Sequence, residues 1–121
     1  MTAEEHKAAM KGILEEYVSS NNVQEASQCL RDLSASYFHH EFVKLGLVLV
    51  LEKKDRETGE RVLSLLQKLS QTGQLSENQI KVGFERVTAS LEDLVLDYPD
   101  AKERVMECAK EAKAKGWLVE A

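Results

Sequence analysis

The sequence has little of what enzymes and metal proteins usually need. Its 121 residues include one proline, three histidines, and two cysteines that are not in CxxC spacing. It contains no GxSxG, P-loop or GxGxxG motif. Basic residues are outnumbered, and a net charge of −5 argues against a general nucleic-acid binder, because phosphate contacts need clustered Lys and Arg. These absences predict a protein that is not an enzyme and uses no metal or other cofactor.

The sequence also lacks a secretory signal and a long apolar run. The longest such run, residues 45–51, is far too short to span a bilayer. Cys29 and Cys108 lie in helical apolar patterns, so we expect both to be reduced and packed, in an intracellular protein. A small basic group is interpreted as a helix-end feature, with nuclear import as a less favoured alternative: Lys53, Lys54 and Arg56. We expect a cytoplasmic protein, and shuttling to the nucleus stays open.

What the chain does have is helix signals. Its composition, 43% hydrophobic and 31% charged, predicts one helical, globular domain over residues 1–121. Thr2 with Glu5, and Ser76 with Gln79, have capping-box spacing. Caps, stops and apolar periodicity predict six helices. They cover about 2–20, 22–33, 37–53 and 55–72, a segment from 76 through 87, and 99–116.

The helix near the middle of the chain is apolar on nearly every side, which is typical of a buried central helix. A strand over residues 47–51 is disfavoured because no neighbouring strand is predicted. We interpret Gly46 as permitting close helix approach, rather than as part of a phosphate loop. Gly116 ends the last helix, and Trp117 then supplies the hydrophobic contact of a Schellman stop. Helices of this length with short loops predict an all-α fold, with antiparallel helical hairpins stacked as a short HEAT-like array.

The only cluster of metal-type side chains is Tyr37-Phe38-His39-His40-Glu41. Neighbouring residues on a helix point about 100° apart, whereas helical zinc sites place their ligands at i,i+3 or i,i+4. His39, His40 and Glu41 do not have that spacing. A structural role at the start of a helix is therefore favoured over a metal site.

The most informative stretch is residues 90–99, which holds the acids Glu92, Asp93 and Asp97, no base, and the only proline. Its apolar residues are expected to anchor it to a core: Leu91, Leu94, Val95 and Leu96. Pro99 is expected in the first turn of the last helix, which puts Asp97 near that helix N-terminus. From these residues alone, the acids are either capping and solvated side chains or a binding surface.

Three stretches resemble the MA3 domain family: residues 17–34 (YVSSNNVQEASQCLRDLS), 38–52 (FHHEFVKLGLVLVLE) and 83–99 (GFERVTASLEDLVLDYP). The likeness is to the C-terminal-type MA3 domains of programmed cell death protein 4 and its multi-domain plant relatives. It runs through most of the chain and includes the helix stops at Gly73 and Gly116. The combination of FHHE, an apolar helix and L-x-x-D-x-x-L-D-x-P is more specific than any one part.

The resemblance implies an atypical HEAT-like stack that binds the DEAD-box helicase initiation factor 4A and represses translation. It implies that Asp93 and Asp97 help to form the helicase-binding surface. Glu92 is adjacent in the sequence, and we expect it to steer encounters without docking directly. A monomer without nucleic-acid or membrane binding is expected. Family repressors usually carry two or more MA3 domains, so the chain is expected to be a single module, with excision from a longer protein left open. The alternatives are a module of a factor 4G-type initiation scaffold, or a general HEAT-like adaptor with an acidic docking loop.

Overall fold

The computed structural model describes residues 2–119, and all regular secondary structure within them is helical. The predicted all-α class is confirmed. The elements in chain order are α1 Ala3–Ser20, α2 Val23–Asp32, the 3-10 helix η1 Ser36–Phe38, α3 His39–Lys53, α4 Arg56–Gln71, α5 Glu77–Ala89, α6 Leu91–Asp97 and α7 Ala101–Ala114. The sequence prediction did not identify η1 or α6 as separate elements.

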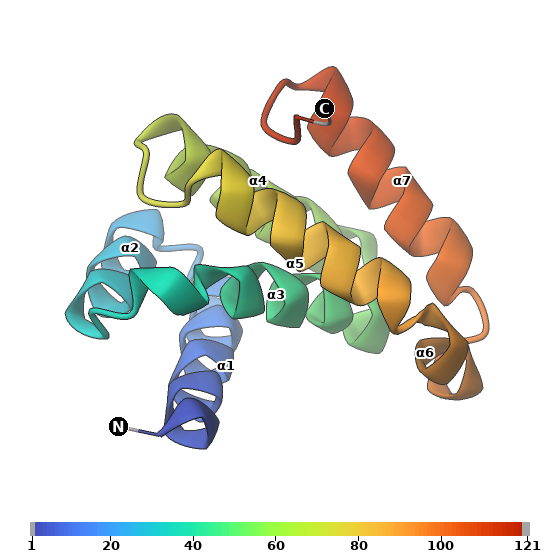
Figure 1. Cartoon of the computed structure of the whole chain (residues 1–121), viewed down its shortest axis with the longest axis horizontal. Coiled ribbons are helices and arrows are strands. Elements are labelled where there is room, and N and C mark those ends of the chain that lie inside the picture. Colours follow the sequence, from blue (N-terminus) through green and yellow to red (C-terminus); the bar gives the residue numbers. More distant parts are fainter. Residues whose placement is uncertain (1, 120–121) are drawn as a thin grey trace.

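Helix α3 lies at the centre of the molecule and contacts α1, α4, α5 and α7 (Figure 1). The first hairpin is α1 with α2, and the second is α3 with α4. Helix α7 packs back against α5 after the short helix α6, which contacts both. The stacked array of helical hairpins is therefore confirmed, with α2 and α6 at opposite ends of it (Figure 1).

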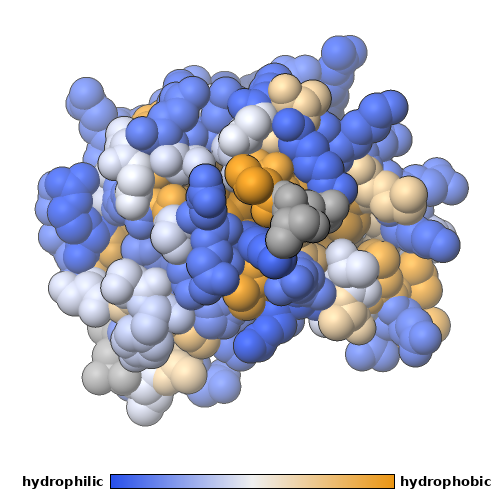
Figure 2. Space-filling view, turned by 45° about the horizontal axis from the view of Figure 1, so that its top comes forward, coloured by the Kyte–Doolittle hydropathy of each residue, from blue (hydrophilic) through white to orange (hydrophobic). Residues whose placement is uncertain are grey.

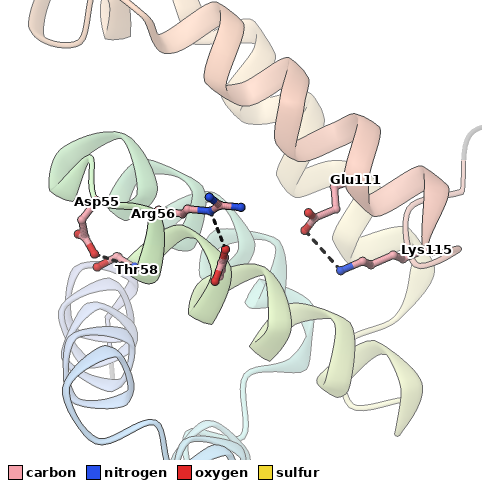
Figure 3. A network of polar contacts seen from close by, with 6 residues as sticks. Asp55, Arg56, Thr58, Glu111 and Lys115 are labelled. Atoms are coloured by element: carbon pink, nitrogen blue, oxygen red, sulfur yellow. Dashed lines mark hydrogen bonds and ion pairs between the residues drawn. The ribbon is translucent and has the colours of Figure 1, made fainter.

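Side-chain caps explain where several helices begin. Thr2 Oγ1 accepts a hydrogen bond from the Glu5 amide at 3.1 Å, and the Thr2 amide donates to Glu5 Oε1 at 2.9 Å, which confirms the capping box. At the start of α4 the Thr58 amide donates to the Asp55 carboxylate at 2.8 Å (Figure 3). Hydrogen bonds from Thr58 hold the pKa of Asp55 below its usual value. Figure 3 also shows the ion pair between Glu111, in the last turn of α7, and Lys115, which directly follows that helix.

The second predicted capping box, at the start of α5, forms only in part. The Gln79 amide donates to Ser76 Oγ at 3.1 Å, as predicted. The Gln79 side chain does not return to Ser76, because its Oε1 accepts the His40 amide at 2.8 Å. Gln79 therefore joins α5 to the start of α3 instead of completing the box.

Two glycines set the distance between α3 and its neighbours. At Gly46 a Cβ atom would lie 3.2 Å from Val62 Cγ1, which confirms a close approach of α3 to α4. At Gly83 the crowding is greater, since a Cβ atom would lie 2.6 Å from Val43 Cβ and 2.9 Å from the His40 carbonyl oxygen. Only glycine fits where α5 crosses α3, a constraint that is not predicted from the sequence alone.

The chain after α7 closes one edge of the core. Gly116 has φ +82°, and its amide donates to the Lys113 carbonyl at 3.1 Å. The Trp117 amide donates to the Ala112 carbonyl at 3.0 Å, so the predicted Schellman motif is confirmed. Trp117 is buried, with its ring centroid 5.9 Å from that of Phe84. The C-terminal segment is thereby tied to α5.

The cysteine prediction is half wrong. Cys108 is buried on α7, and burial raises the pKa of its thiol to about 11. Cys29 is exposed on α2 instead of packed, because α2 buries Ala26 and Leu30 and turns Cys29 toward solvent. Figure 2 shows one face of the molecule, mostly hydrophilic with small apolar patches. Within residues 2–119, each helix is too short or too polar to cross a membrane.

Replacing Leu66 with alanine tests the core. Leu66 is 0% exposed, and the other residues predicted to be most buried are buried too: Leu47, Val50, Leu51, Leu65 and Phe84. Leu66→Ala should lower the free energy of unfolding by roughly 2–5 kcal/mol, because it leaves a cavity. Urea unfolding followed by helical circular dichroism measures this. The exposed Leu96→Ala is the matched control, and equal effects of the two variants would contradict the burial pattern.

Replacing Gly83 with alanine tests the α3–α5 crossing. Alanine normally stabilises a helix over glycine, but here its methyl group would collide with Val43. We expect Gly83→Ala to destabilise the protein by about 1–3 kcal/mol through overpacking. Gly12→Ala is the control, since a Cβ atom there meets nothing within 4 Å, and it should stabilise by about 0.5–1 kcal/mol. A stabilised Gly83→Ala protein would show that the crossing is looser than described.

Candidate protein-binding surface

Helix α6 is a seven-residue helix that joins α5 to α7 and packs against both. Its inner side is formed by partly buried residues at i, i+3, i+4 and i+7 that pack against the core: Leu91, Leu94, Val95 and Tyr98. The predicted anchoring of this segment is confirmed for the first three of these. Helix α6 therefore packs on the core along its whole length and is not held only by the chain at its two ends.

The outer side of α6 carries the three acids together with one leucine. Glu92, Asp93 and Asp97 are exposed, and Leu96 between them is 80% exposed. The prediction that Leu96 anchors the segment is wrong. Residues on a helix turn by about 100°, so a helix that buries positions 91, 94 and 95 must turn position 96 outward. Glu92, Asp93, Leu96 and Asp97 are called the α6 surface below.

The predicted place of Asp97 at the N-terminus of the last helix is also wrong. Asp97 is the last residue of α6, Pro99 lies in the turn that follows, and α7 begins at Ala101. A carboxylate at a helix C-terminus faces the negative end of the helix dipole, which disfavours it by a few tenths of a kcal/mol or more. The N-cap of α7 is Asp100, whose side chain makes no capping hydrogen bond. Its Oδ2 atom lies 3.9 Å from Nη1 of Arg104. Asp97 is therefore not a capping residue.

The carboxylates of the α6 surface have no partner among residues 2–119. None of the described side-chain hydrogen bonds or ion pairs involves Glu92, Asp93 or Asp97. Asp93 and Asp97 have i,i+4 spacing on one helix, with Cβ atoms about 5–6 Å apart, where like charges repel. Asp97 is therefore not the N-terminal cap that one interpretation of the sequence proposed. Both carboxylates have all their acceptor positions open.

The histidine cluster has a structural place at the start of α3. His39 is buried, and burial holds the pKa of its imidazole below the usual value. His40 points to α5, with Nδ1 3.0 Å from Gln79 Oε1, and Phe38 lies against its ring at 5.4 Å between centroids. Glu41 is buried on another side of α3. Within residues 2–119, His, Cys, Asp and Glu side chains nowhere form a group of three able to hold a metal ion.

Comparison with known proteins gives a consistent result. The family model described as the MA3 domain matches residues 6–119. MA3 domain-containing translation regulatory factor 4 of Arabidopsis thaliana is 42% identical over 120 residues, which is 99% of this chain and 19% of that protein. MA3 domain-containing translation regulatory factor 2 of the same plant is 41% identical over 119 residues, 98% of this chain and 17% of that protein.

An animal protein is similar as well. Programmed cell death protein 4 of Gallus gallus is 39% identical over 87 residues, which is 72% of this chain and 19% of that protein. The chain therefore spans about a fifth of the length of the curated relatives it matches.

Proposed function

The chain belongs to the MA3 domain family, and on that premise we propose that it is a protein-binding module of translation regulation. Its proposed partner is the DEAD-box RNA helicase initiation factor 4A. Its proposed effect is to inhibit cap-dependent translation initiation by competing with the factor 4G scaffold and with RNA. The names of the plant relatives, which are translation regulatory factors, support the regulatory part of the proposal.

The observation that carries the proposal is the α6 surface. Two carboxylates, Asp93 and Asp97, lie one helical turn apart without a partner in residues 2–119, on a helix whose opposite side packs on the core. Such carboxylates accept charge-assisted bonds from Arg or Lys, and a guanidinium can bridge a carboxylate through two parallel bonds. Leu96 adds an apolar contact between them, and exposed leucine beside acids suits a protein partner better than a nucleic acid.

Glu92 has a different proposed role. It lies one residue before Asp93 in the first turn of α6, where the helix dipole favours a carboxylate. We expect it to raise the rate of encounter with a basic partner through long-range attraction. The attachment of α6 along its inner side reduces the conformational entropy lost on binding, because the acids are already ordered.

The proposed mechanism of inhibition follows from how a DEAD-box helicase works. Its two RecA-like lobes close around ATP and RNA, and closure completes the active site. A module whose acids engage basic residues on the lobes opposes closure when it binds the open form more tightly than the closed form. The same carboxylates resemble RNA phosphates in charge, which accounts for competition with RNA.

Asp93→Ala with Asp97→Ala should abolish most of the binding to purified initiation factor 4A. Truncating one side of a desolvated charge pair costs about 2–5 kcal/mol, so the dissociation constant should rise at least thirtyfold. Titration calorimetry at two salt concentrations measures this, and wild-type binding should weaken as salt rises. The melting temperature should stay nearly unchanged, because solvated acids contribute little to the fold.

The control for net charge is Glu57→Ala with Glu60→Ala, which removes two exposed carboxylates from α4, each of them in an ion pair with an arginine of the same helix. This control should keep most of the affinity. If both double variants lose the same affinity, net charge and not the α6 surface is responsible. If the α6 double variant unfolds, the acids have a structural role.

An RNA unwinding assay tests the direction of the effect. Adding the domain to initiation factor 4A should lower RNA-dependent unwinding, and adding the factor 4G scaffold should reduce the inhibition by competition. The Asp93→Ala, Asp97→Ala protein should not inhibit. Stimulation of unwinding would assign the chain to the scaffold class instead, and binding without any effect would leave a general adaptor.

A further inference from the structure

A groove with a volume of about 280 Å³ runs between α1 and α2. It lies in the N-terminal hairpin, at the other end of the array from α6 (Figure 1). One side of each helix lines it, and the lining includes Ile13, the buried Tyr17 and Cys29. The groove is therefore separate from the α6 surface, and the proposed function makes no use of it.

Gly12 keeps this groove open at a cost to the helix. It lies in the middle of α1, it is not among the glycines with positive φ, and a Cβ atom there meets nothing within 4 Å. A glycine within a helix makes that helix less stable than an alanine would. At Gly46 and Gly83 the close packing of α3 against its neighbours explains why glycine is present despite this cost. No such packing explains Gly12. A local departure from helix preference that the fold does not need is the pattern of a functional site.

Among residues 2–119, the charged side chains that line the groove are both acidic: Glu16 on α1 and Glu25 on α2. Within residues 2–119 neither carboxylate takes part in a described hydrogen bond or ion pair. Ser20 and Asn22 also line the groove, and their side-chain oxygens already accept backbone amides: Ser20 Oγ from Asn22 at 3.2 Å and Asn22 Oδ1 from Glu25 at 3.0 Å. The charged groups that remain open in the groove are its two carboxylates.

We propose that the α1–α2 groove binds an amphipathic helix of a protein partner, with apolar side chains in the groove and Lys or Arg at Glu16 and Glu25. Unpaired acids beside an apolar groove are complementary to a basic amphipathic helix and repel nucleic acid. The lining residues of α1 extend from Ala9 to Ser20, about 16 Å at 1.5 Å per residue, which matches a helix of three turns. This is a second interaction surface, independent of the α6 surface.

The test uses the intact chain and a defined probe, a 14-residue helical peptide of Leu and Lys with its leucines on one side. The control peptide has Glu in place of Lys. Fluorescence anisotropy should show binding of the Lys peptide and at least about tenfold weaker binding of the Glu peptide. Gly12→Leu fills the groove from an exposed position and should weaken the Lys peptide by at least about tenfold. Glu16→Gln with Glu25→Gln should also weaken it, and should reduce the salt dependence.

The alkylation rates of the two cysteines distinguish binding in the groove from a folding defect and from non-specific attraction. Cys29 is exposed and lines the groove, so bound Lys peptide should slow its alkylation by iodoacetamide. Cys108 is buried, and burial raises the pKa of its thiol to about 11, so it stays unreactive while the protein is folded. Alkylation of Cys108 in any variant reports unfolding. Gly12→Ala, which should be at least as stable as wild type, is the second variant at this position.

Distinct results separate this inference from the proposed function. The Asp93→Ala, Asp97→Ala protein should bind the Lys peptide within about twofold of wild type, and Gly12→Leu should keep its binding to initiation factor 4A. Absence of Lys-peptide binding with unchanged alkylation of Cys29 overturns the inference. Equal binding of the Lys peptide to wild type and to Gly12→Leu also overturns it. Loss of Lys-peptide binding only in the Asp93→Ala, Asp97→Ala protein does so as well. A concentration-dependent dimer that Gly12→Leu abolishes would replace the partner helix with a second copy of this chain.

Discussion

Helix α3 can lie against α1, α4, α5 and α7 because two glycines remove side chains at its tightest contacts. Gly46 belongs to α3 itself and lets α4 approach, and Gly83 belongs to α5 and lets that helix cross over Val43. Helix α3 is buried on nearly all sides, and it contributes more residues to the hydrophobic core cluster than any other described helix. Apolar burial is the main favourable term in folding. The positions of α5, and of everything that follows it, depend on this crossing.

The α6 surface depends on the crossing through the chain itself. Only Ser90 separates α5 from α6, and the Ser90 carbonyl accepts from the Asp93 and Leu94 amides at 3.1 and 3.0 Å. Helix α6 therefore starts where α5 ends, and its inner side reaches the core formed by α5 and α7. Acids that repel one another stay in place because burial of apolar residues on the opposite side outweighs a few tenths of a kcal/mol of repulsion.

Hydrogen-bond partners distinguish the acids that cap helices from the acids that we propose as binding residues. Glu5 and Asp55 accept bonds at helix N-termini, and those bonds hold the pKa of each carboxyl below its usual value. The carboxylate oxygens of such acids already accept hydrogen bonds within the chain, so fewer acceptor positions remain for a binding partner. Asp93, Asp97, Glu16 and Glu25 have no partner in residues 2–119, and they lie beside exposed or groove-lining apolar groups.

Caps and apolar periodicity are local signals, so they predict the all-α class, most helix starts and the buried central helix, and the sequence also singles out the acidic segment as a candidate site. The same signals do not show that Leu96 faces outward, that Asp97 ends a helix rather than begins one, or that Gln79 bonds to α3. Those features depend on where a short helix begins, and on which side of it meets the core. The crossing at Gly83 and the groove beside Gly12 also required the tertiary structure. Both residues are glycines within helices, and only the structure shows that a Cβ atom would collide with Val43 at Gly83 and would meet nothing within 4 Å at Gly12.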